Sequence, residues 1–159
     1  MSAGGDGATP SSDLDLLAPA FRQAVEAAIA ECQTAKLDAM VYEAFRSQQL
    51  QEIYYARGRT VIPPPDTVTN APTNLLSWHG YGLAVDVISK QHRWNRPRAW
   101  FAEVAAIFER HACKWGGHWT KPDNPHFQWG RCKPSPSPVA RQLIHEFGLR
   151  AVWKAVHAE

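Results

Sequence analysis

Hydrophobic residues recur at intervals of three and four near the start of the chain, which is the spacing of one face of an α-helix. Ser12 and Asp15 form a start signal that resembles a capping box. The pattern therefore predicts a helix over residues 12–35 with one face in the core. The positions on this face are Leu17, Phe21, Val25, Ala28 and Cys32.

Two other stretches have the pattern of β-strands. Residues 37–45 alternate loosely, which places Tyr42 and Glu43 on opposite sides of a predicted strand. Residues 83–88 form a hydrophobic run that carries one acid, Asp86. A lone carboxylate in such a run is costly unless it is paired or binds a metal. Asp86 is therefore a candidate for chemistry.

Three further helical segments are predicted along the chain. Ser47 can cap a helix that stops at Gly58, and Pro97 suits the first turn of a helix that continues to about residue 112. Residues 139–156 contain one or two helices, broken near Gly148. The long connection at 59–76 is predicted to form a stiff wall of a cleft.

The length of 159 residues fits one domain with its own core. Residues 1–11 are small and polar and are predicted to be a disordered lead-in. The catalytic domain is assigned to residues 12–133. Residues 134–159 open on a short proline-rich linker and are predicted to be a helical extension that packs on the same domain.

Residues 77–86, with the sequence Ser-Trp-His-Gly-Tyr-Gly-Leu-Ala-Val-Asp, carry the first candidate chemistry. The seven steps from His79 to Asp86 would span roughly 23 Å if extended, whereas each ligand of a zinc ion lies about 2 Å from it. The chain must therefore fold back if both bind one ion. Gly80 and Gly82 permit such a reversal.

A second motif, Asp-Asn-Pro-His at 123–126, supplies another imidazole with a carboxylate three residues before it. Pro125 breaks the regularity of a strand, so we expect an irregular strand entry. Two histidines and one aspartate on a divalent metal leave a position open for water, and a spare carboxylate can take the proton of that water. The residues predict a zinc hydrolase with the ligands His79, Asp86 and His126 and the base Asp123, although other first-row divalent ions would bind similarly.

These motifs resemble the zinc peptidases of the D-alanyl-D-alanine carboxypeptidase family, which includes VanY-type enzymes and L-alanyl-D-glutamate endolysins. The family pattern S-x-H-x-x-G-x-A-x-D is matched without a gap, and an upstream Arg-Ser followed by Gln resembles residues 46–51. The acid at 123 is similar to that of the endopeptidase and endolysin branch. The fold implied is α+β, a small antiparallel sheet that carries the zinc site, flanked by helices and followed by a C-terminal helical tail.

The resemblance implies further site residues. Arg46 would stabilise an oxyanion or hold a substrate carboxylate, and Ser77 and Gln51 would contact the substrate. The segment from Lys114 to Trp119 is similar to a W-G-G segment of the family. Trp115 there either floors the cleft or packs in the core, and His118 either contacts substrate, shuttles protons or competes as a ligand.

Three functions are compatible with these residues. The first is an endolysin-type peptidase that cuts the peptidoglycan stem peptide at L-Ala–D-Glu and lyses bacterial cell walls. The second is a D-Ala-D-Ala carboxypeptidase or dipeptidase of wall maturation. The third is a silent wall-binding module with structural zinc, which the presence of the acid Asp123 disfavours. The partner expected is the stem peptide, and the protein is expected to be a monomer.

Net charge and cysteine content restrict the partners and the cellular compartment that we expect. The net charge of +2 is too small to indicate nucleic acid. Residues 1–40 contribute −4 and the remainder +6, a basic body that suits an anionic wall polymer, although an ordinary solvated surface explains it equally well. The basic C-terminal helix is a candidate for contact with the outer envelope.

Three cysteines without a close pair, Cys32, Cys113 and Cys132, argue against a disulfide framework and favour reduced thiols. The first residues lack the basic and hydrophobic regions of a signal peptide. We expect synthesis in the cytoplasm of a host bacterium and action on the wall in the periplasm after release.

Overall fold

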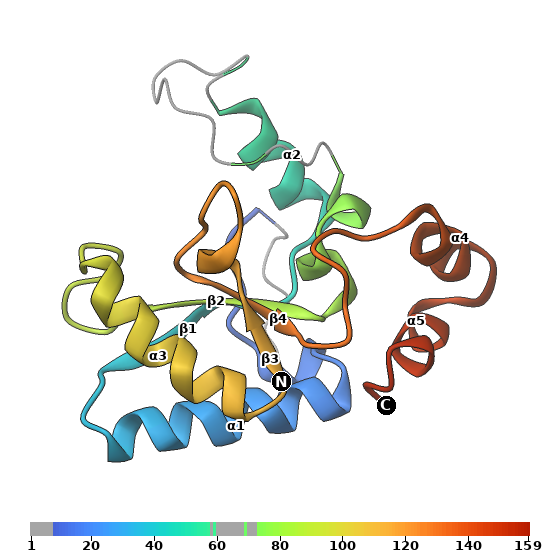
Figure 1. Cartoon of the computed structure of the whole chain (residues 1–159). Coiled ribbons are helices and arrows are strands. Elements are labelled where there is room, and N and C mark those ends of the chain that lie inside the picture. Colours follow the sequence, from blue (N-terminus) through green and yellow to red (C-terminus); the bar gives the residue numbers. More distant parts are fainter. Residues whose placement is uncertain (1–7, 58, 60–68, 70–72) are drawn as a thin grey trace.

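The computed structural model describes residues 8–57, 59, 69 and 73–159 (Figure 1). The predicted disorder of the first seven residues and the predicted helix stop at Gly58 lie outside these ranges. So does most of the connection at 59–76, for which a cleft wall was expected.

Four antiparallel strands form one sheet at the centre of the molecule, in the order β1-β2-β4-β3 (Figure 1). The strands are β1 (Ala39–Glu43), β2 (Ala84–Ser89), β3 (Cys113–Trp115) and β4 (His126–Trp129). The sheet together with its helices confirms the predicted α+β class. The two central strands, β2 and β4, carry Asp86 and His126.

Helices cover the sheet as their hydrophobic faces require. Helix α1 (Pro19–Thr34) and helix α3 (Arg98–Arg110) pack against each other beside the sheet, whereas α2 (Gln48–Ala56) lies across from α1 (Figure 1). The buried positions of α1 are Phe21, Val25, Ala28 and Cys32, as predicted. Ser47 caps α2 by accepting a hydrogen bond from the backbone of Leu50.

The first helix begins later than predicted. Residues Leu14–Leu16 form a short 3-10 helix capped by Asp13, and the α-helix starts at Pro19. The reason is local, because a proline disfavours α-helical geometry at the residue before it, and Ala18 has extended dihedral angles (φ −55°, ψ 137°). Leu17 is buried in the core even so.

The last segment forms two short helices, α4 (Pro138–Phe147) and α5 (Leu149–Ala155), with the break at Gly148 as predicted. Gly148 has φ +85°, a conformation that other residues rarely adopt. The indole of Trp153 donates to the carbonyl of Tyr81, and that of Trp129 donates to the carbonyl of Val156. The first bond ties α5 to the segment that carries the first motif, and the second ties the end of the chain to β4. In the described part of the chain, no helix has both the length and the apolar character needed to cross a membrane.

Candidate metal centre

His79 lies in a short 3-10 helix, η3 (Trp78–Tyr81), that reverses the chain before β2. The Ser77 hydroxyl caps this turn by accepting a hydrogen bond from the backbone N–H of His79. A Cβ atom on Gly80 would lie 2.0 Å from the carbonyl oxygen of Asn74, and Gly82 closes the turn in the left-handed region (φ +66°). The reversal expected from the two glycines is present, and it returns the chain so that His79 faces Asp86.

Asp86 and His126 come together through the register of the sheet. Their Cα atoms are direct partners in the antiparallel pairing of β2 with β4. Side chains of such a pair stand on the same face of a sheet, about 5 Å apart at Cβ. Strand pairing therefore brings together Asp86 and His126, which are 40 residues apart in the sequence.

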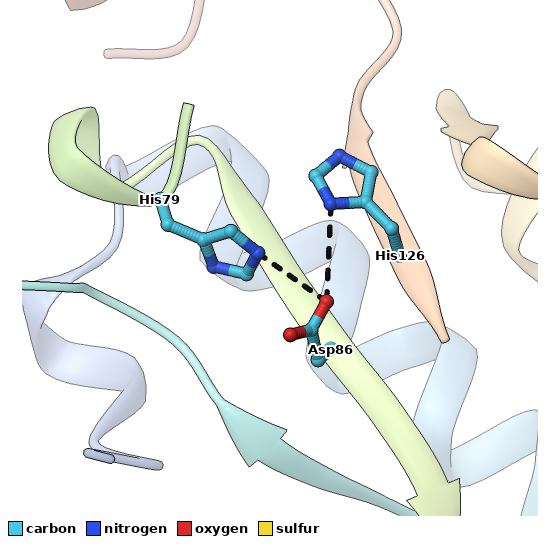
Figure 2. Close-up of side chains that lie close together, drawn as sticks. All are labelled: His79, Asp86 and His126. Atoms are coloured by element: carbon cyan, nitrogen blue, oxygen red, sulfur yellow. Dashed lines mark ion pairs between the residues drawn. The ribbon is translucent and has the colours of Figure 1, made fainter. Parts of the chain in front are cut away.

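The three side chains form one cluster (Figure 2). His79 Nε2 lies 3.3 Å and His126 Nδ1 lies 3.8 Å from the same carboxylate oxygen, Asp86 Oδ1. One ligand atom from each residue lies within 4.8 Å of the others. In the part of the chain that the structure describes, this is the group of His, Cys, Asp and Glu side chains placed to hold a metal ion.

The hydrogen bonds behind the cluster fit a divalent metal. His79 Nδ1 lies 3.0 Å from the carbonyl oxygen of Ala44, and His126 Nε2 lies 2.8 Å from Gln128 Oε1. Both partners are acceptors, since the amide nitrogen of Gln128 donates to the carbonyl of Lys133. Each ring therefore carries a proton on the outer nitrogen, so the inner nitrogen, which faces Asp86, is the one available to a metal, as in metal-binding histidines.

Electrostatics favour a neutral His126 and an ionised Asp86, whereas burial alone would lower the pKa of His79 but the neighbouring Asp86 carboxylate raises it. Burial lowers the pKa of His126 to about 4, so this ring is neutral at neutral pH. Burial alone would raise the pKa of Asp86, but the neighbouring His79 holds it well below its ordinary value, with smaller contributions from His126 and Arg46. The cluster therefore combines a carboxylate with a neutral imidazole, which are donors that first-row divalent ions accept.

Asp123 lies on the loop that leads into β4. The Asp123 backbone N–H donates to Gly116, and its carbonyl accepts from the N–H of His126. This tight turn is the irregular strand entry that the presence of Pro125 led us to expect. Asp123 lines the same cavity as the three clustered residues. Burial, aided by the negative charge of Asp86, raises its pKa to about 6, a value suited to a group that exchanges protons near neutral pH.

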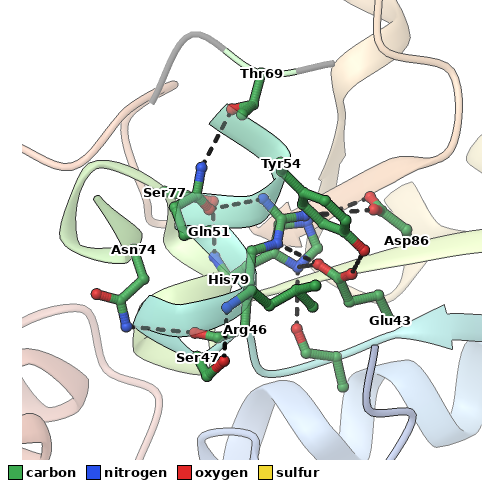
Figure 3. A network of polar contacts seen from close by, with 12 residues as sticks. Glu43, Arg46, Ser47, Gln51, Tyr54, Thr69, Asn74, Ser77, His79 and Asp86 are labelled. Atoms are coloured by element: carbon green, nitrogen blue, oxygen red, sulfur yellow. Dashed lines mark hydrogen bonds and ion pairs between the residues drawn. The ribbon is translucent and has the colours of Figure 1, made fainter. Parts of the chain in front are cut away.

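Arg46 reaches the cluster from the segment between β1 and α2 (Figure 3). Its Nη2 lies 3.8 Å from Asp86 Oδ2, its Nη1 donates to Gln51, and its Nε forms an ion pair with Glu43. The guanidinium also lies 4.8 Å from the centre of the Tyr54 ring. Four contacts hold the cation with one end directed at the candidate metal ligands.

Comparison with known proteins identifies the family. Residues 70–129 match a family model described as D-alanyl-D-alanine carboxypeptidase. The chain is 30% identical over 125 residues to the peptidoglycan L-alanyl-D-glutamate endopeptidase CwlK of Bacillus subtilis (strain 168), covering 70% of this chain and 72% of that protein. The chain belongs to the D-alanyl-D-alanine carboxypeptidase family of metallopeptidases. The resemblance of the motifs is thereby confirmed.

Solved structures agree with this assignment. The Serratia marcescens L-Ala D-Glu endopeptidase ChiX is similar at 26% identity and a TM-score of 0.52, over 73% of this chain and 82% of that chain. A vancomycin-resistance D,D-pentapeptidase VanY in complex with Zn(II) shares the fold, with 13% identity and a TM-score of 0.54, over 83% and 80% of the two chains. The protein is therefore an enzyme with the fold of this metallopeptidase family.

The cavity of this metallopeptidase has a volume of about 960 Å³. Ser77, Arg46 and Asp123 line it together with the cluster, as their predicted roles require. The predicted substrate contact Gln51 is instead fully buried behind Arg46, where its amide accepts from the guanidinium. Gln51 is thus placed to orient Arg46, and its expected contact with substrate stays a prediction.

Two other predicted substrate contacts, Trp115 and His118, are not among the residues that line the cavity. The Trp115 ring is buried, its Nε1 donates to the carbonyl of Asn124, and Arg98 stacks over it. Of the two roles left open for Trp115, the structure shows packing, which supports the loop of Asp123. The exposed side chain of His118 is bonded to Glu109 of α3, because the turn at residues 116–118 directs it outward.

Sequence reasoning missed Glu43, which is buried at the floor of the site. Glu43 is the Cα partner of Asp86 across β1 and β2, so it stands in one row with Asp86 and His126. It accepts hydrogen bonds from Arg46 and from the hydroxyl of Tyr54. A signal was present, since Glu43 is a lone acid in a hydrophobic strand, as Asp86 is.

Gln128 is a second residue that the motifs did not reveal, and its replacement tests the hydrogen bonds behind the cluster. In Gln128→Leu the outer nitrogen of His126 loses its acceptor, so we expect zinc affinity to fall roughly 10- to 100-fold. Competition with a chelator of known affinity measures this, and Gln33→Leu, at an exposed position of α1, is the matched control. Equal affinities of Gln128→Leu and wild type would contradict the role.

Proposed function

We propose that this metallopeptidase is a zinc-dependent peptidoglycan peptidase that cuts the stem peptide between L-Ala and D-Glu. The observation that carries the proposal is the His79, Asp86 and His126 cluster with Asp123 in the same cavity. The choice of bond is supported by two relatives, CwlK and ChiX, whose names both state an L-alanyl-D-glutamate endopeptidase.

Zinc is the metal proposed for the cluster. Two neutral imidazoles and one carboxylate are the donors of many catalytic zinc sites, in which three protein ligands leave one position open. A zinc ion held there supplies a Lewis acid that polarises the scissile carbonyl and makes water nucleophilic near neutral pH. The hydrogen bonds that the outer ring nitrogens donate to the Ala44 carbonyl and the Gln128 amide oxygen keep both imidazoles oriented for this purpose.

Asp123 moves the proton in the proposed mechanism. Its carboxylate accepts a proton from water as the water oxygen bonds to the carbonyl carbon. It then gives this proton to the nitrogen of the departing fragment as the C–N bond breaks, so each cycle ends with the carboxylate restored. The raised pKa of Asp123, about 6, suits both directions of transfer.

Arg46 stabilises charge at the reacting carbonyl. Its guanidinium is held by Glu43 and Gln51 and faces Asp86, so it needs no rearrangement when negative charge develops on the oxygen. One such preorganised donor is worth on the order of 3 kcal/mol in the transition state. Arg57 and Lys121 also line the cavity, which suits a stem peptide that carries free carboxylates.

Mass spectrometry of peptidoglycan digested by the zinc-loaded protein tests the proposal. We expect new amino termini at D-Glu, and no products when the metal is removed with a chelator. Release of D-alanine instead would support the carboxypeptidase alternative, which the description of the family model favours. Intact peptidoglycan would contradict both peptidase functions and indicate a silent wall-binding module.

The lytic role of an endolysin is a further part of the proposal. It is supported by the two endopeptidase relatives alone. The turbidity of permeabilised bacterial cells, followed after addition of the protein, tests it. Cleavage of isolated peptidoglycan without loss of turbidity would contradict the lytic role and leave the peptidase activity intact.

A further inference from the structure

An exposed tryptophan lies on the wall of the cavity that holds the metal cluster. Trp94 follows β2 and is 49% exposed, yet it lines the same cavity as His79 and Asp86. Among the described residues, the other large hydrophobic side chains with such exposure lie outside this cavity: Leu16, Ile53, Val139 and Phe147. Trp94 therefore presents apolar surface at the place where substrate binds.

The ring of Trp94 is held in position by its neighbours. Tyr42 of β1 meets it edge to face, with ring centres 4.6 Å apart and planes at 76°. The Arg93 guanidinium lies 5.6 Å from the centre of each of these two rings. Contacts of this kind are favourable and directional, so the two aromatic rings and the cation form one ordered surface, the Trp94 platform.

The turn that carries the platform is also preorganised. Ser89 and Arg93 exchange two backbone hydrogen bonds, and the Asp38 carboxylate accepts from the Ser89 hydroxyl and the backbone of Gln91. Arg93 has φ +57°, a left-handed conformation that costs energy for a residue with a side chain. Backbone strain held by such a network is characteristic of functional sites.

A β-bulge places the platform next to the metal cluster. Val41 pairs with Val87 and Glu43 pairs with Asp86, so Tyr42 is the extra residue of β1. The predicted alternation of Tyr42 and Glu43 fails here, since both line the cavity. Tyr42 is one residue from Glu43, and Glu43 pairs with Asp86 across the strands. The Cα atoms of Tyr42 and Asp86 are therefore at most roughly 9 Å apart.

We propose that the Trp94 platform binds a sugar ring of the glycan strand to which the stem peptide is attached. This inference rests on the proposed function and deepens it. The hydrophobic C–H face of a pyranose ring suits an aromatic surface, and its hydroxyl groups suit Arg93, an exposed donor beside the Trp94 ring. In peptidoglycan L-Ala is joined directly to the lactyl group of the sugar. The lactyl group and one residue, which spans at most about 3.6 Å, therefore separate the sugar ring from the bond that is cut.

The test compares a disaccharide-linked stem peptide with the same peptide without sugar. The measured quantity is the ratio of kcat/KM for the two substrates. One stacking contact changes binding by roughly twofold to tenfold, so we expect a ratio of that size for the wild type and a ratio near one for Trp94→Ala. Trp94→Phe should retain most of the preference. Phe147→Ala, which removes an exposed ring of α4, is the matched control and should retain all of it.

A binding measurement makes the result independent of cleavage. Calorimetry with Asp123→Ala, and with the same protein carrying Trp94→Ala in addition, compares the affinities for the two ligands. Loss of the sugar preference in the protein with Trp94→Ala, and its retention in the protein without this substitution, would support the platform. A preference that survives Trp94→Ala, or a wild-type ratio near one, would overturn it. If the wild type cleaves neither substrate, the proposed function fails, and the calorimetry still decides the sugar contact.

Discussion

Asp123→Ala is expected to lose hydrolysis while it keeps the metal. The carboxylate is assigned to proton transfer, and general acid–base groups typically contribute roughly 10²- to 10⁴-fold to a rate. Asp123 is not one of the three clustered residues, so the zinc content of the purified variant should equal that of the wild type. Peptide turnover and metal analysis on the same preparation measure both quantities.

Two companion variants sharpen this result. Asp123→Asn keeps the size of the side chain and removes its ability to accept the proton, so it should be as inactive as Asp123→Ala. His126→Ala removes a candidate ligand and should lose both zinc and turnover. Near-normal turnover in Asp123→Ala would contradict the assignment of proton transfer, and loss of zinc in that variant would mean that Asp123 serves the metal instead.

Glu43→Ala is expected to lower both stability and activity strongly. It leaves the Arg46 guanidinium, which is almost fully buried, without the carboxylate that pairs with its Nε, while the more distant Asp86 carboxylate stays 3.8 Å from Nη2. Removal of one member of a buried ion pair typically costs about 3–5 kcal/mol, because the remaining charge is left uncompensated. Arg46 should also lose its orientation toward Asp86. Denaturant unfolding and kcat/KM measure the two effects.

Tyr54→Phe is the matched control for Glu43. It removes one hydrogen bond to the same carboxylate and keeps the ring beneath Arg46, so we expect a loss of about 1 kcal/mol and nearly normal turnover. Glu43→Gln preserves the shape of the side chain without its charge and should fall between the two. A Glu43→Ala protein as stable as Tyr54→Phe would show that the ion pair is not what holds Arg46.

The sequence by itself determined the chemistry of the cluster. His79, Asp86 and His126 followed from local information: an acid isolated in a hydrophobic run, glycines that permit a reversal, and a proline that breaks a strand before a histidine. The helices and the strands β1 and β2 followed from hydrophobic patterns and capping signals, whereas β3 was not predicted. Such signals are readable because each depends on residues close together in the chain.

Only the tertiary structure decided which distant side chains support that chemistry. The pairing of β1 with β2 sets Glu43 opposite Asp86, and a single extra residue turns Tyr42 into the same cavity. Gln128, by contrast, lies two residues after His126 in β4, so the alternation along this strand already places both side chains on one face. Register and bulges are set by the packing of whole strands, and a shift of one residue reverses every side chain. For this reason a local pattern could mark Glu43 as an unusual buried acid, but it could not show that Glu43 stands opposite Asp86 or that Tyr42 turns into the cavity.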